Sequence, residues 1–210
     1  QECIENIFSN YHIEDESKKK KTYITADIAL EGSDLFVIFV WKGWKVIKVV
    51  TREVTQSAEI VGDLRDLQNE YRVSGTRTMI DGDGIGAMLK GQVNARFFKN
   101  GGRVVKTPKY TSNYRNISVQ CLYYLAREII NNDQMWIADE NLTREYKKRI
   151  KDELAQIIRV PNKQDFAKLD IKAKGEMMSD LGFSPDFLDC MKMRVWFDLK
   201  KELDLTVVWN

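Results

Sequence analysis

The sequence predicts an α/β fold, a five-stranded mixed sheet flanked by helices with the element order β-β-β-α-β-α-β. Three apolar runs separated by tight turns come first, and the second of them, residues 35–41, is apolar throughout, which is typical of a central strand. The next segment has apolar residues at helical spacing, namely Ile60, Leu64, Leu67 and Tyr71. A fourth apolar run then ends in Asp81, so the pattern returns from helix to strand.

The composition is that of an ordinary globular chain. Of its 210 residues, 43% are hydrophobic and 30% are charged, which is enough for one sizeable core. No signal peptide is recognisable and no apolar run reaches the ~18 residues that cross a membrane, so we expect no membrane partner. The three cysteines lie far apart without metal-ligand spacing, which predicts thiols in a reducing compartment. Because the chain begins with Gln1, we expect it to be a piece of a longer protein.

The first half of the chain supplies the sheet. We expect a linker segment over residues 1–21 and a single domain over residues 22–210. Strands are predicted at residues 22–30, 35–41 and 44–54, in the run that ends at Asp81, and at residues 93–98. The amphipathic helix between the third and fourth strands covers residues 56–71. The glycines after Asp81 let the backbone turn sharply into a short helix near Ala87.

The second half of the chain supplies helices and an insertion. Helices are predicted at residues 116–132, at residues 141–158, and from Ser184 onward. Thr143 is a suitable cap for the second of these, and Ser184 followed by Pro185 is a typical helix start. Residues 157–171 are expected to form a hairpin. The segment 134–171 is therefore an insertion before the last helix.

Four carboxylates are candidates for one site, and Asp81 stands at the end of a strand, where open α/β sheets usually place their chemistry. Asp27 interrupts the first strand in an apolar neighbourhood, and Asp81 ends the fourth strand. Burying a lone carboxylate is costly unless it is paired, hydrogen-bonded or bound to a metal. In this element order the first and fourth strands are parallel neighbours, so both carboxylates can converge on one site. Asp186 and Asp189 lie three residues apart on one face of the last helix.

The donor set indicates a divalent cation. Carboxylates from separate segments, without histidine or cysteine nearby, are the hard oxygen ligands that suit Mg²⁺ or Mn²⁺. Two such ions about 3.5–4 Å apart can activate a water and stabilise the leaving oxygen of a phosphodiester. The carboxylates therefore predict a two-ion site.

The segment that begins at Asp81 partly matches two other motifs, but neither match is complete. The letters DGD suggest a calcium loop, but its fifth position is Ile85 and its twelfth is Gln92. The letters GDGIGA fit a dinucleotide fingerprint, but no acidic residue follows until Glu128, and the preceding strand is the fourth rather than the first. We therefore reject both interpretations.

Three segments carry a resemblance to a known family. They read YITADIALEGSD from residue 23, MIDGDGIGAML from residue 79 and KAKGEMMSDLGFSPDFLDCMKM from residue 172. With the element order, they resemble the RNase H-like (retroviral integrase-like) nucleases. More narrowly, they resemble the C-terminal nuclease domain of the large terminase subunit of tailed bacteriophages. The resemblance covers nearly all of residues 22–200.

The resemblance implies a metal-dependent endonuclease that cleaves double-stranded DNA, cutting a viral concatemer during genome packaging. Asp27 and Asp81 would be catalytic metal ligands, with Asp27 bridging both ions and Asp81 holding one. The last acid of the family maps to Asp186 or Asp189, with Asp186 preferred, and both are candidates for holding the other ion. Because a metal-activated water attacks the phosphate, no nucleophilic side chain is needed.

One stretch of the chain is basic without interruption. Between Gly84 and Arg127 there is no Asp or Glu, while basic residues stand at Lys90, Arg96, Lys99, Arg103, Lys106, Lys109, Arg115 and Arg127. Such a block is a candidate footprint for a polyanion, although a solvated basic face explains it equally well. The letters NYR ending at Arg115 also resemble an element of the terminase family. We expect contacts with DNA phosphates from Arg115, Lys172, Lys174, Lys106 and Lys109.

The same resemblance implies partners. No GxxxxGK[ST] motif occurs, so the ATPase motor domain of a full-length terminase is not in this chain. That motor, the small terminase subunit and the portal protein would be its partners, in the cytoplasm of the host cell.

Two other functions remain open. A Holliday-junction resolvase has a related fold, a D-x-x-D in its last helix and branched DNA as substrate, but the basic loop at residues 99–115 and the insertion at 134–171 fit a terminase better. A catalytically silent domain that docks onto a portal or capsid protein would have no reason to hold Asp27 and Asp81 in apolar strands.

Overall fold

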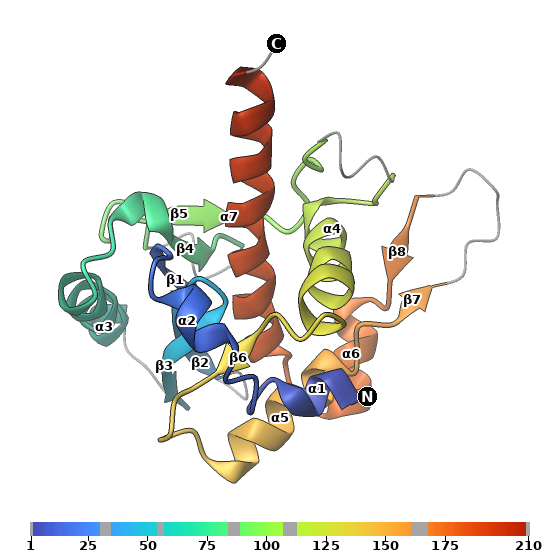
Figure 1. The fold of residues 1–210 in the computed structure, drawn as a ribbon, viewed down its shortest axis with the longest axis horizontal. Coiled ribbons are helices and arrows are strands. Elements are labelled where there is room, and N and C mark those ends of the chain that lie inside the picture. The colour runs from blue at the N-terminus through green and yellow to red at the C-terminus, as the bar shows by residue number, and fades with distance from the viewer. Residues whose placement is uncertain are drawn as a thin grey trace.

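The sheet at the centre of the molecule has six strands in the order β5-β4-β1-β2-β3-β6 (Figure 1). This computed structural model describes residues 2–29, 35–53, 57–83, 89–106, 113–160 and 168–208. The strands of the sheet are β1 (Thr22–Asp27), β2 (Phe36–Lys42), β3 (Lys45–Arg52), β4 (Thr78–Asp81), β5 (Arg96–Phe98) and β6 (Trp136–Ile137).

The strand directions make the sheet mixed. β1, β2 and β3 form an antiparallel meander. After the crossover through α3 (Ser57–Glu70), β4 pairs in parallel with β1, and β5 pairs in parallel with β4. The predicted α/β fold is confirmed. The sequence did not indicate β6, which pairs in parallel with β3, because two residues are too few to show a strand pattern. The predicted helix near Ala87 lies outside the described residues.

Helices cover both faces of the sheet (Figure 1). α3 packs on one face, and α7 (Asp186–Val208) packs on the other together with α4 (Ile117–Tyr124) and α5 (Arg144–Leu154). The other elements are α1 (Glu2–Asn6), α2 (Ile13–Ser17), the 3₁₀ turn η1 (Gly75–Arg77), the π-helical segment η3 (Leu125–Ile130), the hairpin strands β7 (Arg159–Val160) and β8 (Asp170–Ile171), and α6 (Lys174–Leu181).

The central strand β2 divides the hydrophobic core in two. Its odd-numbered residues Val37, Phe39 and Trp41 pack toward α7. Its even-numbered residues Phe36, Ile38 and Val40 pack toward α3. All six are fully buried, so the apolar run that identified a central strand is explained by burial on both faces.

The predicted helix boundaries are close to those observed. α7 begins directly after Ser184 and Pro185, and Thr143 caps α5 by accepting a hydrogen bond from the Tyr146 amide at 3.2 Å. β7 and β8 form the predicted antiparallel hairpin, whose turn lies outside the described residues. The sequence did not indicate α6. At the N-terminus, Ile7, which directly follows α1, packs in the hydrophobic core, and Ile13 of α2 is buried.

Within the described parts of the chain, no helix is both long and apolar enough to span a membrane. The three cysteines are free thiols, and two of them, Cys121 and Cys190, are buried.

Candidate metal centre

The ends of β1 and β4 place two carboxylates side by side. The strands pair in parallel with Ala26 opposite Ile80, so the next residues in this register are Asp27 and Asp81, which end their strands. The predicted strand ran on to residue 30 with Asp27 in its middle. In the structure it stops at Asp27, because the chain must turn back to begin β2 at Phe36.

Both carboxylates point to the same face of the sheet. Ala26 and Ile80 pack in the core under α3, and neighbouring side chains of a strand point to opposite faces. Asp27 and Asp81 therefore point toward α7.

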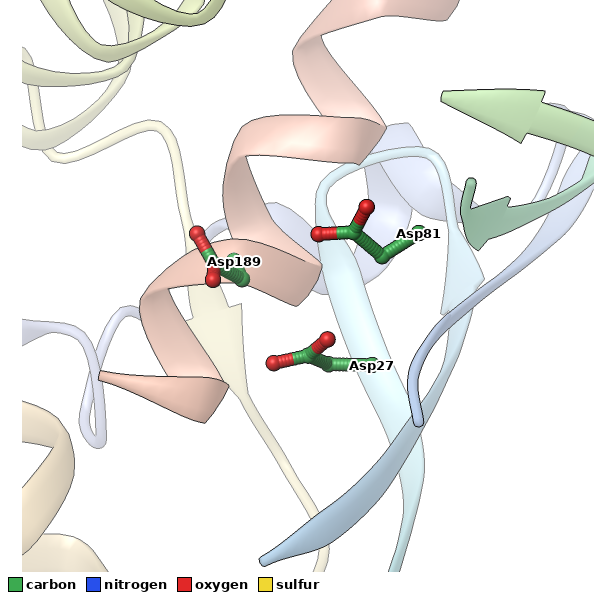
Figure 2. Close-up of side chains that lie close together, drawn as sticks. All are labelled: Asp27, Asp81 and Asp189. Carbon is green, nitrogen blue, oxygen red and sulfur yellow. The ribbon is translucent and has the colours of Figure 1, made fainter. Parts of the chain in front are cut away.

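The third carboxylate comes from the first turn of α7. Asp27, Asp81 and Asp189 each contribute one carboxylate oxygen to a group of three atoms that lie within 4.8 Å of one another. Figure 2 shows the three side chains converging from two strand ends and the helix. Their exposed fractions are only 9%, 8% and 4%. Three nearly buried carboxylates at one point are a set of donors suited to a hard divalent cation.

The electrostatics of this group are uneven. Burial, and then the negative charge of Asp189, raise the pKa of Asp27 well above its ordinary value, against the opposing effect of Lys174. Burial also acts to raise the pKa of Asp189, but Lys192 and Lys174 outweigh it and lower that pKa. Asp27 is therefore the carboxylate whose charge is most disfavoured in the cluster.

Two lysines neutralise Asp189. Lys192 Nζ lies 2.5 Å from Asp189 Oδ1, and Lys174 Nζ lies 2.6 Å from Asp189 Oδ2. Their surroundings differ, since the Lys192 side chain is 3% exposed and the Lys174 side chain 50% exposed. Lys174, which the sequence analysis assigned to DNA phosphates, is thus ion-paired to a member of the carboxylate cluster.

Asn100 connects the two halves of the cluster. Its Nδ2 donates to Asp81 Oδ2 at 3.2 Å and to Asp83 Oδ2 at 2.9 Å. Its Oδ1 accepts a hydrogen bond from Lys192 Nζ at 2.6 Å. Neither Asn100 nor Lys192 was predicted from the sequence. Lys192 stands three residues after Asp189 on the same helical face, which could have revealed it, whereas Asn100 follows β5 with no recognisable pattern.

Asp186 lies outside the cluster. Its Oδ2 accepts hydrogen bonds from the Leu35 amide at 2.9 Å and from Arg149 Nη2 at 2.6 Å. Burial raises the pKa of Asp186, against the opposing effects of hydrogen bonds from Ser184 and the Leu35 amide and of the positive charge of Arg149. The geometry thus favours Asp189 over Asp186 as the third ligand, the reverse of the sequence-based preference. The reason is that Arg149 of α5 and the Leu35 amide, just before β2, both donate hydrogen bonds to Asp186. Asp189, which lies one turn further along α7, faces the ends of β1 and β4 instead.

The glycine after Asp81 permits a close contact between backbones. The Gly82 amide donates to the Phe98 carbonyl at 2.7 Å. A Cβ at position 82 would lie 2.6 Å from the Phe98 carbonyl oxygen and 3.0 Å from the Phe97 Cβ. Any other residue would push β5 away from the end of β4, so this glycine keeps Asp81 in place.

We therefore expect Gly82→Ala to lower the free energy of unfolding by about 1–3 kcal/mol and to weaken Mn²⁺ binding. Urea unfolding and titration calorimetry would measure the two effects. Gly62→Ala in α3 is the matched control, because its added Cβ meets nothing within 4 Å and alanine favours the helix. Equal stability and metal affinity in the two variants would contradict this role for Gly82.

Comparisons with known proteins agree on the fold. No protein-family profile and no curated protein sequence matches the chain. Among solved structures, the nuclease domain of the large terminase subunit gp2 of bacterial virus Sf6 aligns with a TM-score of 0.72 at 21% identity, over 92% of this chain and 96% of that one. The chain has the fold of a phage large-terminase nuclease domain.

Further structures with the large-terminase nuclease fold contain metals. A point mutant of the Sf6 domain, solved with manganese and beta-thujaplicinol, aligns with a TM-score of 0.74 at 21% identity, over 92% of this chain and 96% of that one. The large terminase nuclease of thermophilic phage G20c, solved with magnesium, aligns with a TM-score of 0.53 at 15% identity, over 84% and 81%.

Of the remaining cations expected to contact DNA, Arg115 and Lys172 lie next to β8 in this terminase-nuclease fold. Arg115 pairs with Asp170 at 3.0 Å while its side chain stays 63% exposed. Lys172 pairs with Asp180 and lies 2.5 Å from Gln156 Oε1. Lys106 is exposed. Lys109 lies outside the described residues.

Proposed function

We propose that this protein is a metal-dependent endonuclease that cleaves double-stranded DNA by two-metal hydrolysis during viral genome packaging. The observation that carries the proposal is the cluster of Asp27, Asp81 and Asp189 in a large-terminase nuclease fold. Residues 22–210 would form the nuclease domain, with 134–171 as its insertion.

The residues of the cluster fit Mg²⁺ or Mn²⁺. All three donors are carboxylates, and among the described residues no histidine or cysteine joins the group. Asp27 would be shared between two ions, with Asp81 holding one and Asp189 the other. Bound there, the ions would activate water and stabilise the charge of the leaving oxygen. The protein would hold these carboxylates aligned, with Asn100 and Lys192 bracing Asp81 and Asp189.

The partners follow from the same assignment. We expect an ATPase motor domain to present the DNA, with a small terminase subunit and a portal protein in the same complex, in the cytoplasm of the host cell. Because exposed lysines and arginines contact phosphates rather than bases, we expect little sequence preference.

Cleavage of supercoiled plasmid with Mn²⁺, Mg²⁺ or EDTA tests the proposal. The wild type should nick and linearise the plasmid only with a divalent metal, and Asp81→Ala should not cut. Asp66→Ala is the control, because Asp66 is an exposed aspartate on α3. Cutting that survives in Asp81→Ala would exclude this site. Preference for a four-way junction would favour the resolvase, and absence of both metal binding and cutting would favour a docking domain.

The two candidates for the third ligand give opposite predictions. Asp189→Asn should lower Mn²⁺-dependent cleavage about 10²-fold or more, because it removes a carboxylate from the cluster. Asp186→Asn should keep most of the activity, because Asp186 contacts Arg149 and the Leu35 amide instead. Initial cleavage rates would measure both. A larger loss in Asp186→Asn than in Asp189→Asn would restore the sequence-based preference.

Metal affinity should rise with pH. Burial and the charge of Asp189 raise the pKa of Asp27 above the ordinary 3.8, so a proton competes with the cation above that pH. The competition ends only when the pH exceeds the raised pKa. Mn²⁺ titrations at increasing pH above 3.8 should therefore show increasing affinity, with proton release, until the raised pKa of Asp27 has been passed. Affinity that does not change with pH would contradict a protonated Asp27.

A further inference from the structure

A cavity of about 1190 Å³ lies at the end of the sheet opposite the metal centre. It is lined by Tyr23 near the start of β1 and by Arg77 just before β4. The lining residues from α7 are Arg194, Trp196, Phe197, Asp198, Lys200 and Lys201. Asp27 and Asp81 end those same two strands. α7 runs along β1, since Asp189 is beside Asp27 while Arg194 stacks on Tyr23 with 4.3 Å between guanidinium and ring centre.

Positive charge dominates the lining of this cavity. Its acidic residues are Glu16, Glu128 and Asp198. Its basic residues are Lys19, Lys20, Lys21, Arg77, Arg96, Arg194, Lys200 and Lys201. Asp198 is already engaged by Arg194 at 2.9 Å and by the Trp44 indole at 2.9 Å. The walls of the cavity therefore carry an excess of cations that the acidic residues do not neutralise.

One wall is a segment of three lysines with a fixed backbone. The Lys20 amide donates to the Ser17 carbonyl at 2.9 Å, and the Lys21 carbonyl accepts from the Gly43 amide at 3.1 Å. Gly43 has a φ of +64°, and a Cβ there would lie 3.0 Å from Lys20 Cγ. The β2–β3 turn thus holds the backbone of this segment and the stem of Lys20, while the side chains of the segment remain exposed.

Other residues that line the cavity are aromatic rings stacked with cations. The Arg194 side chain is 3% exposed, lies 4.6 Å from the Trp44 ring centre and donates to the Gly43 carbonyl at 3.0 Å. Trp196 has Arg96 at 5.5 Å and Lys200 at 5.6 Å from its ring centre. Such stacking holds cations in place without neutralising them. Arg96 belongs to the basic block seen in the sequence, so this part of the block contributes to the cavity.

We propose that this cavity is a second DNA-contact surface, which binds backbone phosphates of duplex DNA on the side of the domain away from the metal centre. Lysines on an exposed wall bind phosphates as mobile point charges and release counterions on doing so. Lys19, Lys20, Lys21 and Lys201 have no ion-pair partner within the described part of the chain and are exposed. That the bound polyanion is DNA rests on the proposed function. The positive charge of the cavity is a property of the residues that line it.

The apolar surface of the molecule argues against a protein partner in this cavity. Interfaces between proteins have apolar and aromatic residues at their centres. The exposed large hydrophobic residues of the described chain are Tyr11, Ile158, Val160 and Met178, and none of them lines the cavity. The aromatic residues that do line it are buried or half-buried, and Trp44 and Trp196 stack with cations. The exposed residues of the lining are mostly lysines and arginines, so a partner meets mainly charge at the surface of the cavity.

The test is DNA binding measured in EDTA, where the metal centre cannot cut. Fluorescence anisotropy would give the affinity of a labelled duplex for the wild type and for Lys21→Gln/Lys201→Gln at several salt concentrations. Removing two phosphate contacts should lower the slope of log affinity against log salt by about 2, and weaken binding at low salt on the order of tenfold. The control is Lys147→Gln/Lys148→Gln on α5, which removes the same charge outside the cavity.

Equal affinities and slopes for the two double variants would overturn the proposal. Competition by polyglutamate as strong as that by unlabelled duplex would also overturn it, since the cavity would then be a site for acidic peptides. Thermal melting with and without Mn²⁺ checks that each variant folds and keeps its metal centre. Because no cleavage is measured, loss of DNA binding in the cavity variant would support this surface even if the plasmid assay excluded a nuclease.

Discussion

Asp27→Asn should lower metal-dependent cleavage by about 10³-fold or more, and leave the protein without metal at least as stable as the wild type. The loss of activity is expected because asparagine keeps the shape of the side chain but cannot supply the charge that a shared metal ligand needs. Asp27 is nearly buried and stands within 4.8 Å of the other two carboxylates, so no other group could replace it.

The stability of this variant follows from the pKa of Asp27. Burial and the charge of Asp189 raise this pKa in the folded protein, while the unfolded chain keeps the ordinary 3.8. The folded state therefore holds a proton that the unfolded state has released above that pH. The contribution of Asp27 to stability is lost as the pH rises from 3.8 through the raised pKa. Asparagine does not ionise, so it avoids the cost of a buried negative charge. The free energy of unfolding at neutral pH should therefore be at least as high in the variant as in the wild type.

Thermal melting in EDTA and in Mn²⁺, combined with plasmid cleavage, would measure these effects. The wild type should melt at a higher temperature with Mn²⁺, because an ion that binds only the folded state stabilises it, and Asp27→Asn should lose this increase. Asp66→Asn on the surface of α3 is the matched control and should behave as the wild type. A variant that melts well below the wild type in EDTA would show that Asp27 serves the fold rather than a metal.

Arg149→Ala should lower the free energy of unfolding by about 3–5 kcal/mol, the cost of leaving two buried acidic side chains without their partner. Arg149 Nε donates to Glu153 Oε1 at 3.1 Å, and its Nη2 donates to Asp186 Oδ2 at 2.6 Å. The side chains of Glu153 and Asp186 are only 0% and 2% exposed. Burial raises the pKa of Glu153 to about 8 even with Arg149 present, so removal of this arginine would leave two costly acids in the core.

Urea unfolding of Arg149→Ala beside Lys148→Ala would isolate the effect. Lys148 is the preceding residue of α5 and also has a partner four residues on, Asp152, but its side chain is 77% exposed. Its replacement should cost less than about 1 kcal/mol. Adding Glu153→Gln to Arg149→Ala should restore part of the lost stability, because it removes one of the buried acids. Similar costs for the two single variants would contradict the prediction.

This network also connects stability to the site. Glu153 accepts a hydrogen bond from the Leu188 amide at 2.8 Å, and Asp189 is the next residue. Arg149 and Glu153 therefore fix the first turn of α7 against α5. The contacts of Arg149 and Glu153 with α7 could not be read from the sequence, because α5 and α7 are separated by the hairpin and α6.

The sequence by itself determined five of the six strands of the sheet and two members of the cluster. The apolar run of β2 identified a central strand because burial on both faces requires apolar residues at every position. Asp27 and Asp81 were identifiable because a carboxylate next to buried strand residues is costly without a partner. The start of α7 was readable because Ser184 and Pro185 act locally, within one turn of the helix.

Only the tertiary structure decided which residues complete the site. The choice of Asp189 over Asp186 depends on Arg149 of another helix, and the bracing of the cluster depends on Asn100 and Lys192 meeting from separate segments. The basic cavity likewise combines the lysines before β1 with residues of α7. The sequence records the spacing along one element, whereas contacts between elements depend on the packing of the whole core, which no local pattern encodes.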